Sequence, residues 1–246
     1  MHTENLQKKR IQDAFKQSGL REYSIFLNVL KCIAVKAGQA ITPSVITTSF
    51  NSVLGTSISH NTIKKYFYAV EKAGFISKVE RFYIKGTKAK IKNADHVYIS
   101  DVDLFNYVNQ DNRFGMELGA KGEEVFLLSR GRTAFYNILM ESDYEVTGGR
   151  VEYSIRSKKV GSKRIGQNID FMTVKNDSRQ HFVFITKKQR ESLINSADEA
   201  DEFLRAIGSI GDAAQVYIVD VWESKATACF GKIILLGVDA ALDLIS

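Results

Sequence analysis

Basic side chains gather in one stretch of this 246-residue chain. Residues 60–100 contain nine lysines and arginines but three acids, so this stretch alone carries a net charge of +6, which equals the net charge of the whole chain. A local excess of cationic side chains attracts the phosphates of nucleic acids. The residues that we predict to contact nucleic acid are His60, Asn61, Lys64, Lys65, Arg81, Lys85, Lys88, Lys90 and Lys92. The alternative is that these lysines form a solvated face.

The first four of these residues begin a strongly marked helix. Ser59 can cap its first turn, and Gly74 can adopt the left-handed conformation that ends the last turn. Between them, Ile63, Phe67 and Val70 recur at helical spacing. We therefore predict an amphipathic helix whose apolar stripe faces a core and whose basic face is left for a partner.

Neighbouring segments make this helix the second of a pair. Pro43 suits the first position of a preceding helix, which Gly55 ends. After the pair, residues 75–84 alternate like a strand and residues 97–99 return as a second strand, so that the basic stretch 85–93 lies within a hairpin. Two helices followed by a hairpin are typical of a winged helix-turn-helix, whose second helix enters the major groove of DNA.

The C-terminal half has a different pattern. A polar stretch, residues 109–113, separates a short helix ending at Val108 from a longer helical pattern, and strands and helices alternate after it. Such alternation is typical of an α/β domain. We predict two domains, residues 1–108 and 114–246. Within the second, the predicted helices and strands cover residues 119–136, 144–151, 166–174, 181–186, 216–221 and 233–236, with the acidic segment 198–202 in a further helix.

Three local patterns follow one another along the chain. They are Leu54-Gly-Thr-Ser-Ile-Ser-His-Asn-Thr-Ile-Lys-Lys-Tyr-Phe with Ala73-Gly-Phe-Ile76, then Val97-Tyr-Ile-Ser-Asp101 with Leu104, and then Gly119-Ala-Lys-Gly-Glu123, Asn168-Ile-Asp170-Phe171 and Phe184-Ile-Thr-Lys187. Their order resembles the C-terminal accessory region of bacterial and archaeal AAA-type ATPases. The resemblance implies a winged helix-turn-helix followed by a restriction-endonuclease-like, PD-(D/E)XK-type α/β domain. It also implies a P-loop ATPase domain or protein as a partner.

A nuclease of this type needs carboxylates that hold Mg²⁺ and a lysine that orients the attacking water. The resemblance gives the metal-ligand roles to Asp170 and Glu123 and the lysine role to Lys187. Ile185 stands where the family has its central glutamate. Since this exchange removes an oxygen ligand from the metal site, we predict a degenerate site. A Mg²⁺-dependent DNA nuclease that uses Asp170, Glu123 and Lys187 is the alternative.

Other features depart from the ATPase family. No G-x-x-x-x-G-K-[ST] motif occurs, so we predict no ATPase activity for the chain itself. His96 and Asp103 stand where the family has a lysine and a glycine. Asp101 fits the family signature, but its simplest role is to cap the helix that follows it.

Composition limits the class of protein. The chain is 44% apolar and 25% charged, which is typical of a globular domain. Cys32 and Cys229 lie far apart without neighbouring histidines, which argues against a disulfide framework or a zinc site and favours a reducing, cytoplasmic setting. The apolar run Ile233–Ile245 is short and contains two aspartates, so no membrane segment is expected.

The sequence thus predicts a cytoplasmic accessory protein that binds DNA or a protein partner and needs no cofactor. A protein-interaction adaptor without affinity for nucleic acid is a further alternative. The sequence sets no oligomeric state.

Overall fold

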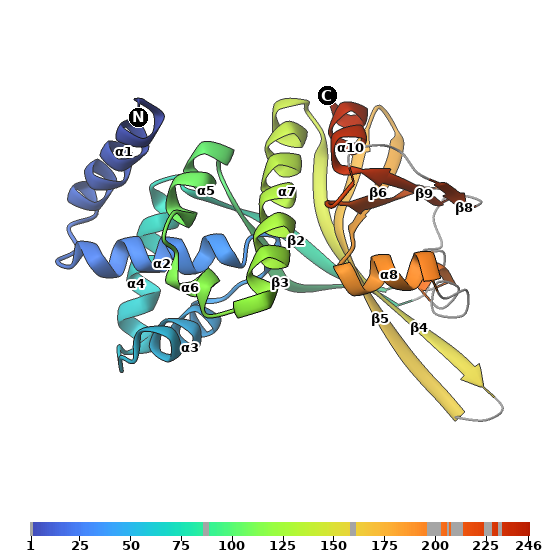
Figure 1. Ribbon diagram of the computed structural model, residues 1–246, viewed down its shortest axis with the longest axis horizontal. Coiled ribbons are helices and arrows are strands. Elements are labelled where there is room, and N and C mark those ends of the chain that lie inside the picture. Colours follow the sequence, from blue (N-terminus) through green and yellow to red (C-terminus); the bar gives the residue numbers. More distant parts are fainter. Residues whose placement is uncertain are drawn as a thin grey trace. The chain divides into compact units, whose positions relative to one another are not determined.

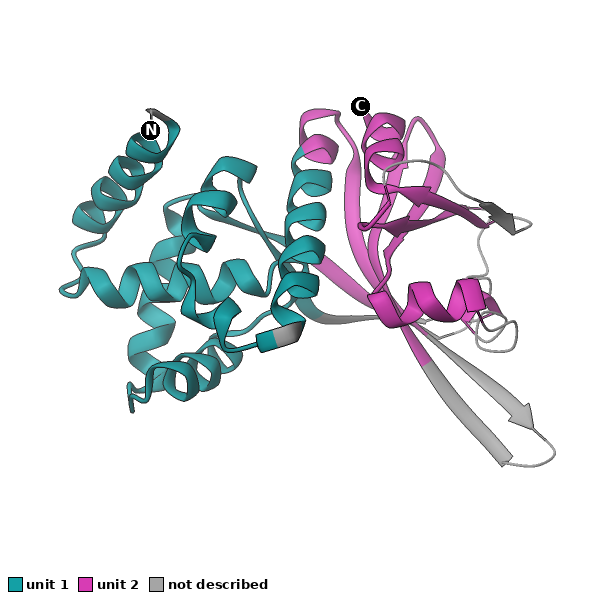
Figure 2. Ribbon diagram, viewed as in Figure 1, with its two compact units in different colours: residues 1–78, 94–137 teal, residues 79–93, 138–246 magenta. Residues whose placement is uncertain are grey.

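A computed structural model describes most of the chain. It covers residues 2–85, 89–157, 161–195, 203–205, 207, 214–223, 228–230 and 233–246, with side chains described outside residues 2, 83–85, 89–93, 120, 152–157, 161–165 and 228–230. The fold is mixed α+β, with both parallel and antiparallel strand pairs. Contacts divide it into two compact units (Figure 2), Met1–Lys78 with Ala94–Asn137 and Val79–Asn93 with Ile138–Ser246.

The first unit is mainly helical (Figure 1). Its elements are α1 (His2–Ser18), α2 (Tyr23–Val35), β1 (Gln39–Ala40), α3 (Pro43–Leu54), α4 (His60–Lys72), the start of β2 (Ile76–Lys85), the end of β3 (Ala89–Ile99), α5 (Val102–Asn109), α6 (Arg113–Met116), the 3-10 turn η1 (Gly119–Lys121) and most of α7 (Gly122–Glu141). Helix α2 is central, because it contacts α1, α3, α4, α5 and α6. Phe26, Leu30 and Phe67 are among the fully buried side chains of this core.

The predicted caps of the helix pair are confirmed. Thr42 caps α3, with Pro43 at its first position. The Ser59 hydroxyl accepts a hydrogen bond from the Thr62 amide at 3.2 Å, which satisfies a backbone donor that the first turn of α4 leaves free. Gly74 follows the helix with a φ of +72°, a left-handed conformation that suits glycine.

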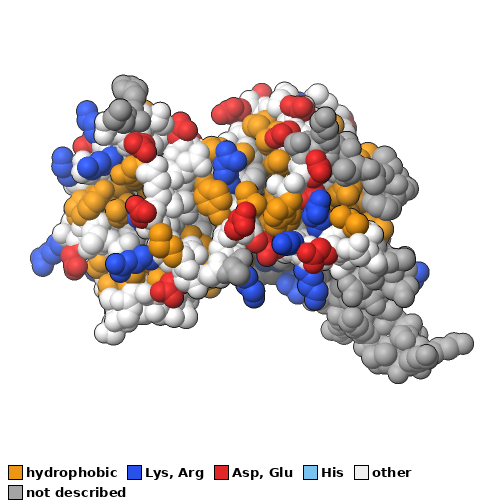
Figure 3. Space-filling view, in the orientation of Figure 1, with side chains coloured by type: hydrophobic (Ala, Val, Ile, Leu, Met, Phe, Trp, Pro, Cys, Tyr) orange, Lys and Arg blue, Asp and Glu red, His pale blue; other side chains and the backbone are white. Residues whose placement is uncertain are grey.

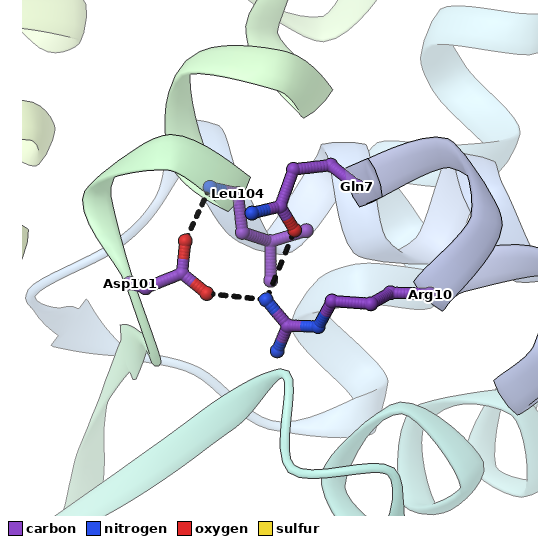
Figure 4. Close-up of polar contacts among 4 residues, drawn as sticks. All are labelled: Gln7, Arg10, Asp101 and Leu104. Carbon is purple, nitrogen blue, oxygen red and sulfur yellow. Dashed lines mark hydrogen bonds and ion pairs between the residues drawn. The ribbon is translucent and has the colours of Figure 1, made fainter. Parts of the chain in front are cut away.

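Asp101 also has its predicted role, at the start of α5 (Figure 4). One carboxylate oxygen accepts the Leu104 amide hydrogen bond at 2.5 Å, and the other accepts from the Arg10 guanidinium at 2.7 Å. The same Arg10 nitrogen donates to the Gln7 side chain at 3.0 Å. Asp101 therefore caps α5 and ties it to α1.

The division into units differs from the predicted boundary at residues 109–113. Helix α7, expected to open the second domain, packs largely within the first unit. Its Ser129 hydroxyl donates to the Val35 carbonyl at 3.0 Å, and its Tyr136 ring stacks on Tyr98 with centroids 4.7 Å apart. Because a buried aromatic stack and a buried hydrogen bond hold α7 to this core, the polar stretch before it does not separate two units.

The second unit is built on a mixed sheet. Its further elements are β4 (Glu145–Ser157), β5 (Gly161–Lys175), β6 (Ser178–Phe184), α8 (Lys187–Asn195), β7 (Gln215–Asp220), β8 (Ala228–Phe230), β9 (Ile233–Gly237) and α10 (Val238–Ile245). The hydrogen-bonded order, with the start of β3 included, is β3-β2-β4-β5-β6-β7-β9-β8. Strand β2 enters this sheet because its outer half pairs in parallel with β4, where Arg81 lies opposite Gly148.

Successive side chains along β6 point to opposite faces of this sheet. Val183, and Ile185 directly after the strand, belong to one apolar core, which Leu193 of α8 helps to cover. Phe182 points to the other face and stacks on Tyr217, with ring centroids 5.1 Å apart. The five strands predicted for this half are present, whereas the acidic segment 198–202 lies outside the described residues. No helix in the described part of the chain is both long and apolar enough to cross a membrane.

Candidate nucleic-acid interface

Helix α4 presents the basic face that its sequence predicts. Asn61, Lys64 and Lys65 are exposed, while Ile63 and Phe67 on the opposite side are 0% and 1% exposed. The exposed residues recur every three to four positions, so they share one face of the helix. Two ammonium groups and one amide thus lie together within the first turns of α4.

The turn before α4 is held by one side chain of α3. The Asn51 amide nitrogen donates to the Ile58 carbonyl at 2.9 Å, and its oxygen accepts from the Ile58 amide at 3.0 Å. An asparagine that bonds both backbone groups of a residue fixes the local chain direction. His60 adds a contact across the same turn, because its Nε2 lies 3.2 Å from the Ser44 hydroxyl. The start of α4 is therefore fixed against α3.

Tyr66 is a core residue, as the sequence predicts. It is 4% exposed, and its hydroxyl accepts a hydrogen bond from the Glu22 amide at 3.1 Å. Tyr66 thereby anchors the middle of α4 at the start of α2. It is not available to stack on a base.

Two residues that the sequence analysis did not assign extend this face. Tyr68 is 48% exposed. The ammonium nitrogens of Lys64 and Lys78 lie 5.9 and 5.6 Å from the centroid of its ring. The Lys64 contact has a signal in the sequence, since the two residues are four apart on one helix. The Lys78 contact has none, because it depends on how β2 follows α4.

Arg81 does not belong to the exposed surface that we predicted. It is 6% exposed, and its guanidinium donates to the Asn168 side chain at 2.7 Å in the second unit. A buried guanidinium needs such partners, so Arg81 serves the sheet and is not available to a DNA phosphate. Lys88 lies outside the described residues, as do the side chains of Lys85, Lys90 and Lys92, whose backbones belong to β2 and β3.

Charges of both signs lie on the face of the first unit shown in Figure 3. Blue and red side chains alternate there, and no broad area has a single sign.

Asp170, the central nuclease candidate, is buried within the second unit. It is 2% exposed, and its carboxylate accepts a hydrogen bond from the Phe184 amide at 2.8 Å. The backbone pairing of β5 with β6 reaches only Phe171 and Phe182 on this side. Asp170 thus accepts a hydrogen bond from an amide that lies just beyond the end of this pairing. A buried backbone amide needs such an acceptor. This arrangement explains the aspartate without catalysis.

Lys187 lies at the first position of α8, beyond the end of β6, and it is exposed. Thr186 and Gln189 form a reciprocal cap there: the Gln189 side chain accepts from the Thr186 amide at 2.9 Å, and the Thr186 hydroxyl accepts from the Gln189 amide at 3.3 Å. Ile185 is 0% exposed in the apolar core. The Ile-Thr-Lys segment therefore ends a strand and begins a helix.

Glu123 is exposed in the first turn of α7 and belongs to the first unit, whereas Asp170 and Lys187 belong to the second. Within the described residues, no group of three or more histidine, cysteine, aspartate or glutamate side chains is placed to hold a metal ion. The roles given to Glu123, Asp170 and Lys187 by the family resemblance stay predictions.

A second buried carboxylate in this unit holds α8. Asp220, at the end of β7, is 3% exposed and accepts from the Arg190 guanidinium at 2.7 Å and from the Trp222 amide at 3.0 Å. Asp170 and Asp220 are thus alike, because each is a buried carboxylate that accepts a hydrogen bond from a backbone amide. Both have structural partners.

Comparisons with known proteins give the chain a partial match. The model of a family described as a domain of unknown function (DUF8612) matches residues 2–115. No curated protein matches the chain. A solved structure, protein VC1899 from Vibrio cholerae, aligns with 90% of this chain at 10% identity and a TM-score of 0.30, and the chain spans 55% of that protein's length. Kinship with the accessory regions of AAA-type ATPases, and a P-loop partner, stay predictions.

Proposed function

We propose that this protein binds DNA through the exposed face of α4, with the first unit acting as a winged helix-turn-helix. The observation that carries this proposal is the grouping of Asn61, Lys64 and Lys65 at the capped start of the second helix of a pair. In such motifs the first turns of that helix approach base edges and phosphates.

The fixed position of α4 supports this function. A recognition helix must keep its orientation while its polar face meets a ligand. Tyr66 joins α4 to the start of α2 by a hydrogen bond, Ser59 caps α4, and Asn51 fixes the turn before it. The exposed side chains are thus free for a partner, while the helix that carries them is rigidly seated.

The proposed chemistry is mainly electrostatic. Ammonium groups that neutralise backbone phosphates release bound cations, so binding weakens as salt rises. Asn61 adds the one amide of this face, and an amide pairs well with the hydrogen-bonding edge of adenine. We therefore infer affinity for duplex DNA in general, with any base preference resting on Asn61.

Charge reversal tests the proposal. Lys64→Glu/Lys65→Glu should weaken binding of a fluorescent 30-base-pair duplex by at least about tenfold at 100 mM salt, as measured by anisotropy, because each phosphate contact contributes strongly at this salt. The matched control is Lys8→Glu/Lys9→Glu, which reverses two adjacent exposed lysines on α1 of the same unit. Equal affinity of the two double variants would contradict binding through α4, and failure of the native protein to bind would favour the protein adaptor.

The nuclease alternative has a separate test. The protein is incubated with supercoiled plasmid and Mg²⁺ or Mn²⁺, beside Asp170→Asn, which keeps an oxygen acceptor for the Phe184 amide. We expect no metal-dependent cutting by either protein. Cleavage by the native protein that Asp170→Asn abolishes would establish a nuclease and overturn the expectation of a degenerate site.

A further inference from the structure

Tyr68 lies on the exposed face of α4, beyond the residues that the sequence assigns to DNA. It is seven residues after Asn61, about 10 Å further along the helix axis. The residue is 48% exposed, although tyrosines usually bury most of their apolar surface. Its hydroxyl has no hydrogen-bond partner among the residues that the structure describes. The ring meets the buried Phe67 edge-on, with centroids 6.0 Å apart, and the rest of it is left to solvent.

Two ammonium groups from different elements meet at this ring. Lys64 of α4 and Lys78 of β2 place their nitrogens 5.9 and 5.6 Å from its centroid. Lys78 is also 5.5 Å from the centroid of Phe67 and forms an ion pair with Glu71 at 2.7 Å. Ammonium groups at these distances are attracted to aromatic faces. The ring thus holds two positive charges beside a free hydroxyl, and Glu71 orients one of them.

The chemistry of this cluster fits an anion. A phenol hydroxyl and two ammonium groups are all hydrogen-bond donors, and the ammonium groups have no acceptor atoms. Donors that carry charge bind phosphate oxygens with short, strong hydrogen bonds. Because the ammonium groups lie over the ring, its hydroxyl edge is the part left for a ligand. Stacking of a base on the ring face is therefore disfavoured.

We propose that Tyr68, Lys64 and Lys78 form a binding subsite for one backbone phosphate of nucleic acid. This inference rests on the proposed function, because it assigns the phosphate to a strand already bound along α4. The subsite would fix the register of the helix, while Asn61 lies nearer the base edges. Contacts to phosphate position a protein on DNA without reading sequence, so the subsite should act equally on all sequences.

Three single variants test the subsite by duplex anisotropy. Tyr68→Phe removes the hydroxyl alone and should weaken binding by about tenfold, the loss of one hydrogen bond to a charged group. Lys78→Gln should weaken it by about fivefold and reduce the magnitude of the negative slope of log K against log salt by about 0.9. Glu71→Gln should tighten binding by about twofold, since Lys78 then loses its counter-charge. Lys9→Gln on α1 is the control for net charge, and thermal unfolding checks that each variant folds.

The outcomes separate the subsite from DNA binding as such. Native affinity in all three variants, together with a strong loss in Lys64→Glu/Lys65→Glu, would reject the subsite and leave DNA binding intact. A further variant, Tyr68→Ala, removes the whole ring. Weaker binding by this variant, with native affinity in Tyr68→Phe, would show base stacking, which also rejects the subsite. Absence of duplex binding by the native protein at 50 mM salt would reject both proposals.

Discussion

Helix α4 of the first unit and the sheet of the second unit both carry charged side chains that the sequence assigns to a ligand, yet these side chains differ in exposure. Lys64 and Lys65 face solvent, whereas Asp170 and Arg81 are 2% and 6% exposed and hydrogen-bond within the fold. A buried charge without partners is costly, so the fold itself engages such groups. An exposed lysine is under no such constraint. Charged residues in a sequence therefore indicate a ligand site only where the fold leaves them accessible.

The largest loss of stability should come from removing the buried carboxylate of Asp170. Asp170→Ala leaves the Phe184 amide unsatisfied in the core and should lower the free energy of unfolding by about 3 kcal/mol. Urea unfolding measures this loss. Asp243→Ala on α10, where the aspartate is exposed, is the control and should change stability by less than about 0.5 kcal/mol. Equal stability of the two variants would mean that Asp170 has no structural role.

A close approach inside the first unit gives the next effect. Gly38 has a φ of +79°, and a Cβ there would lie 2.3 Å from the Cδ of Arg132. Gly38→Ala should therefore cost about 2 kcal/mol or more through combined steric clash and backbone strain. Gly19→Ala is a matched control, because its φ is +68° and no atom lies near. It should cost only about 1 kcal/mol. A smaller cost at Gly38 than at Gly19 would show that Arg132 moves aside freely.

Burial also controls the chemistry of a thiol in the first unit. Desolvation raises the pKa of Cys32 to about 12. Since the folded thiol has a higher pKa than the unfolded one, its stabilising contribution is complete below about pH 8.5 and is lost as pH rises toward the folded pKa. The free energy of unfolding should therefore fall by up to about 1.4 kcal/mol per pH unit above pH 9. Urea unfolding between pH 8 and 10.5 should show a weaker dependence in Cys32→Ala. If the free energy of unfolding of Cys32→Ala fell with pH as steeply as that of the native protein, the pH dependence would not come from Cys32.

The smallest effect concerns the cap of α4. Ser59→Ala removes the acceptor of the Thr62 amide and should cost about 1 kcal/mol. Ser57→Ala, at an exposed serine two residues earlier, is the control and should be nearly neutral. Because the cap also fixes the residues that we propose to contact DNA, duplex affinity should fall slightly with Ser59→Ala and stay unchanged with Ser57→Ala. A neutral Ser59→Ala would mean that α4 is held by packing.

The helix pair could be predicted from sequence because its signals are local. Ser59, Pro43 and Gly74 act on backbone groups within a few residues, so their types indicate where α3 and α4 begin and end. Asp101 could be predicted as a cap for the same reason. The apolar spacing of α4 then gives the side that faces the core.

The burial of Arg81 and the place of α7 depend on distant partners, which local patterns do not report. Arg81 meets Asn168, 87 positions later, and Tyr136 stacks on Tyr98, 38 positions earlier. Residues 81–84 of β2 would alternate in the same way with or without a neighbour beyond the hairpin. The sequence therefore does not reveal that they pair with β4. The Lys78 contact with Tyr68 spans only ten positions, but it depends on how β2 follows α4, which the sequence does not show.

The dependence of duplex affinity on salt tests the central claim most directly. Log K for the native protein, Lys64→Glu/Lys65→Glu and Lys8→Glu/Lys9→Glu is measured between 50 and 200 mM salt. The slope of log K against log salt is negative, and in the α4 variant its magnitude should be smaller than in the native protein by about 1.8, since two phosphate contacts are lost. The α1 variant should keep the native slope. Identical slopes for the native protein and the α4 variant would contradict DNA binding through α4.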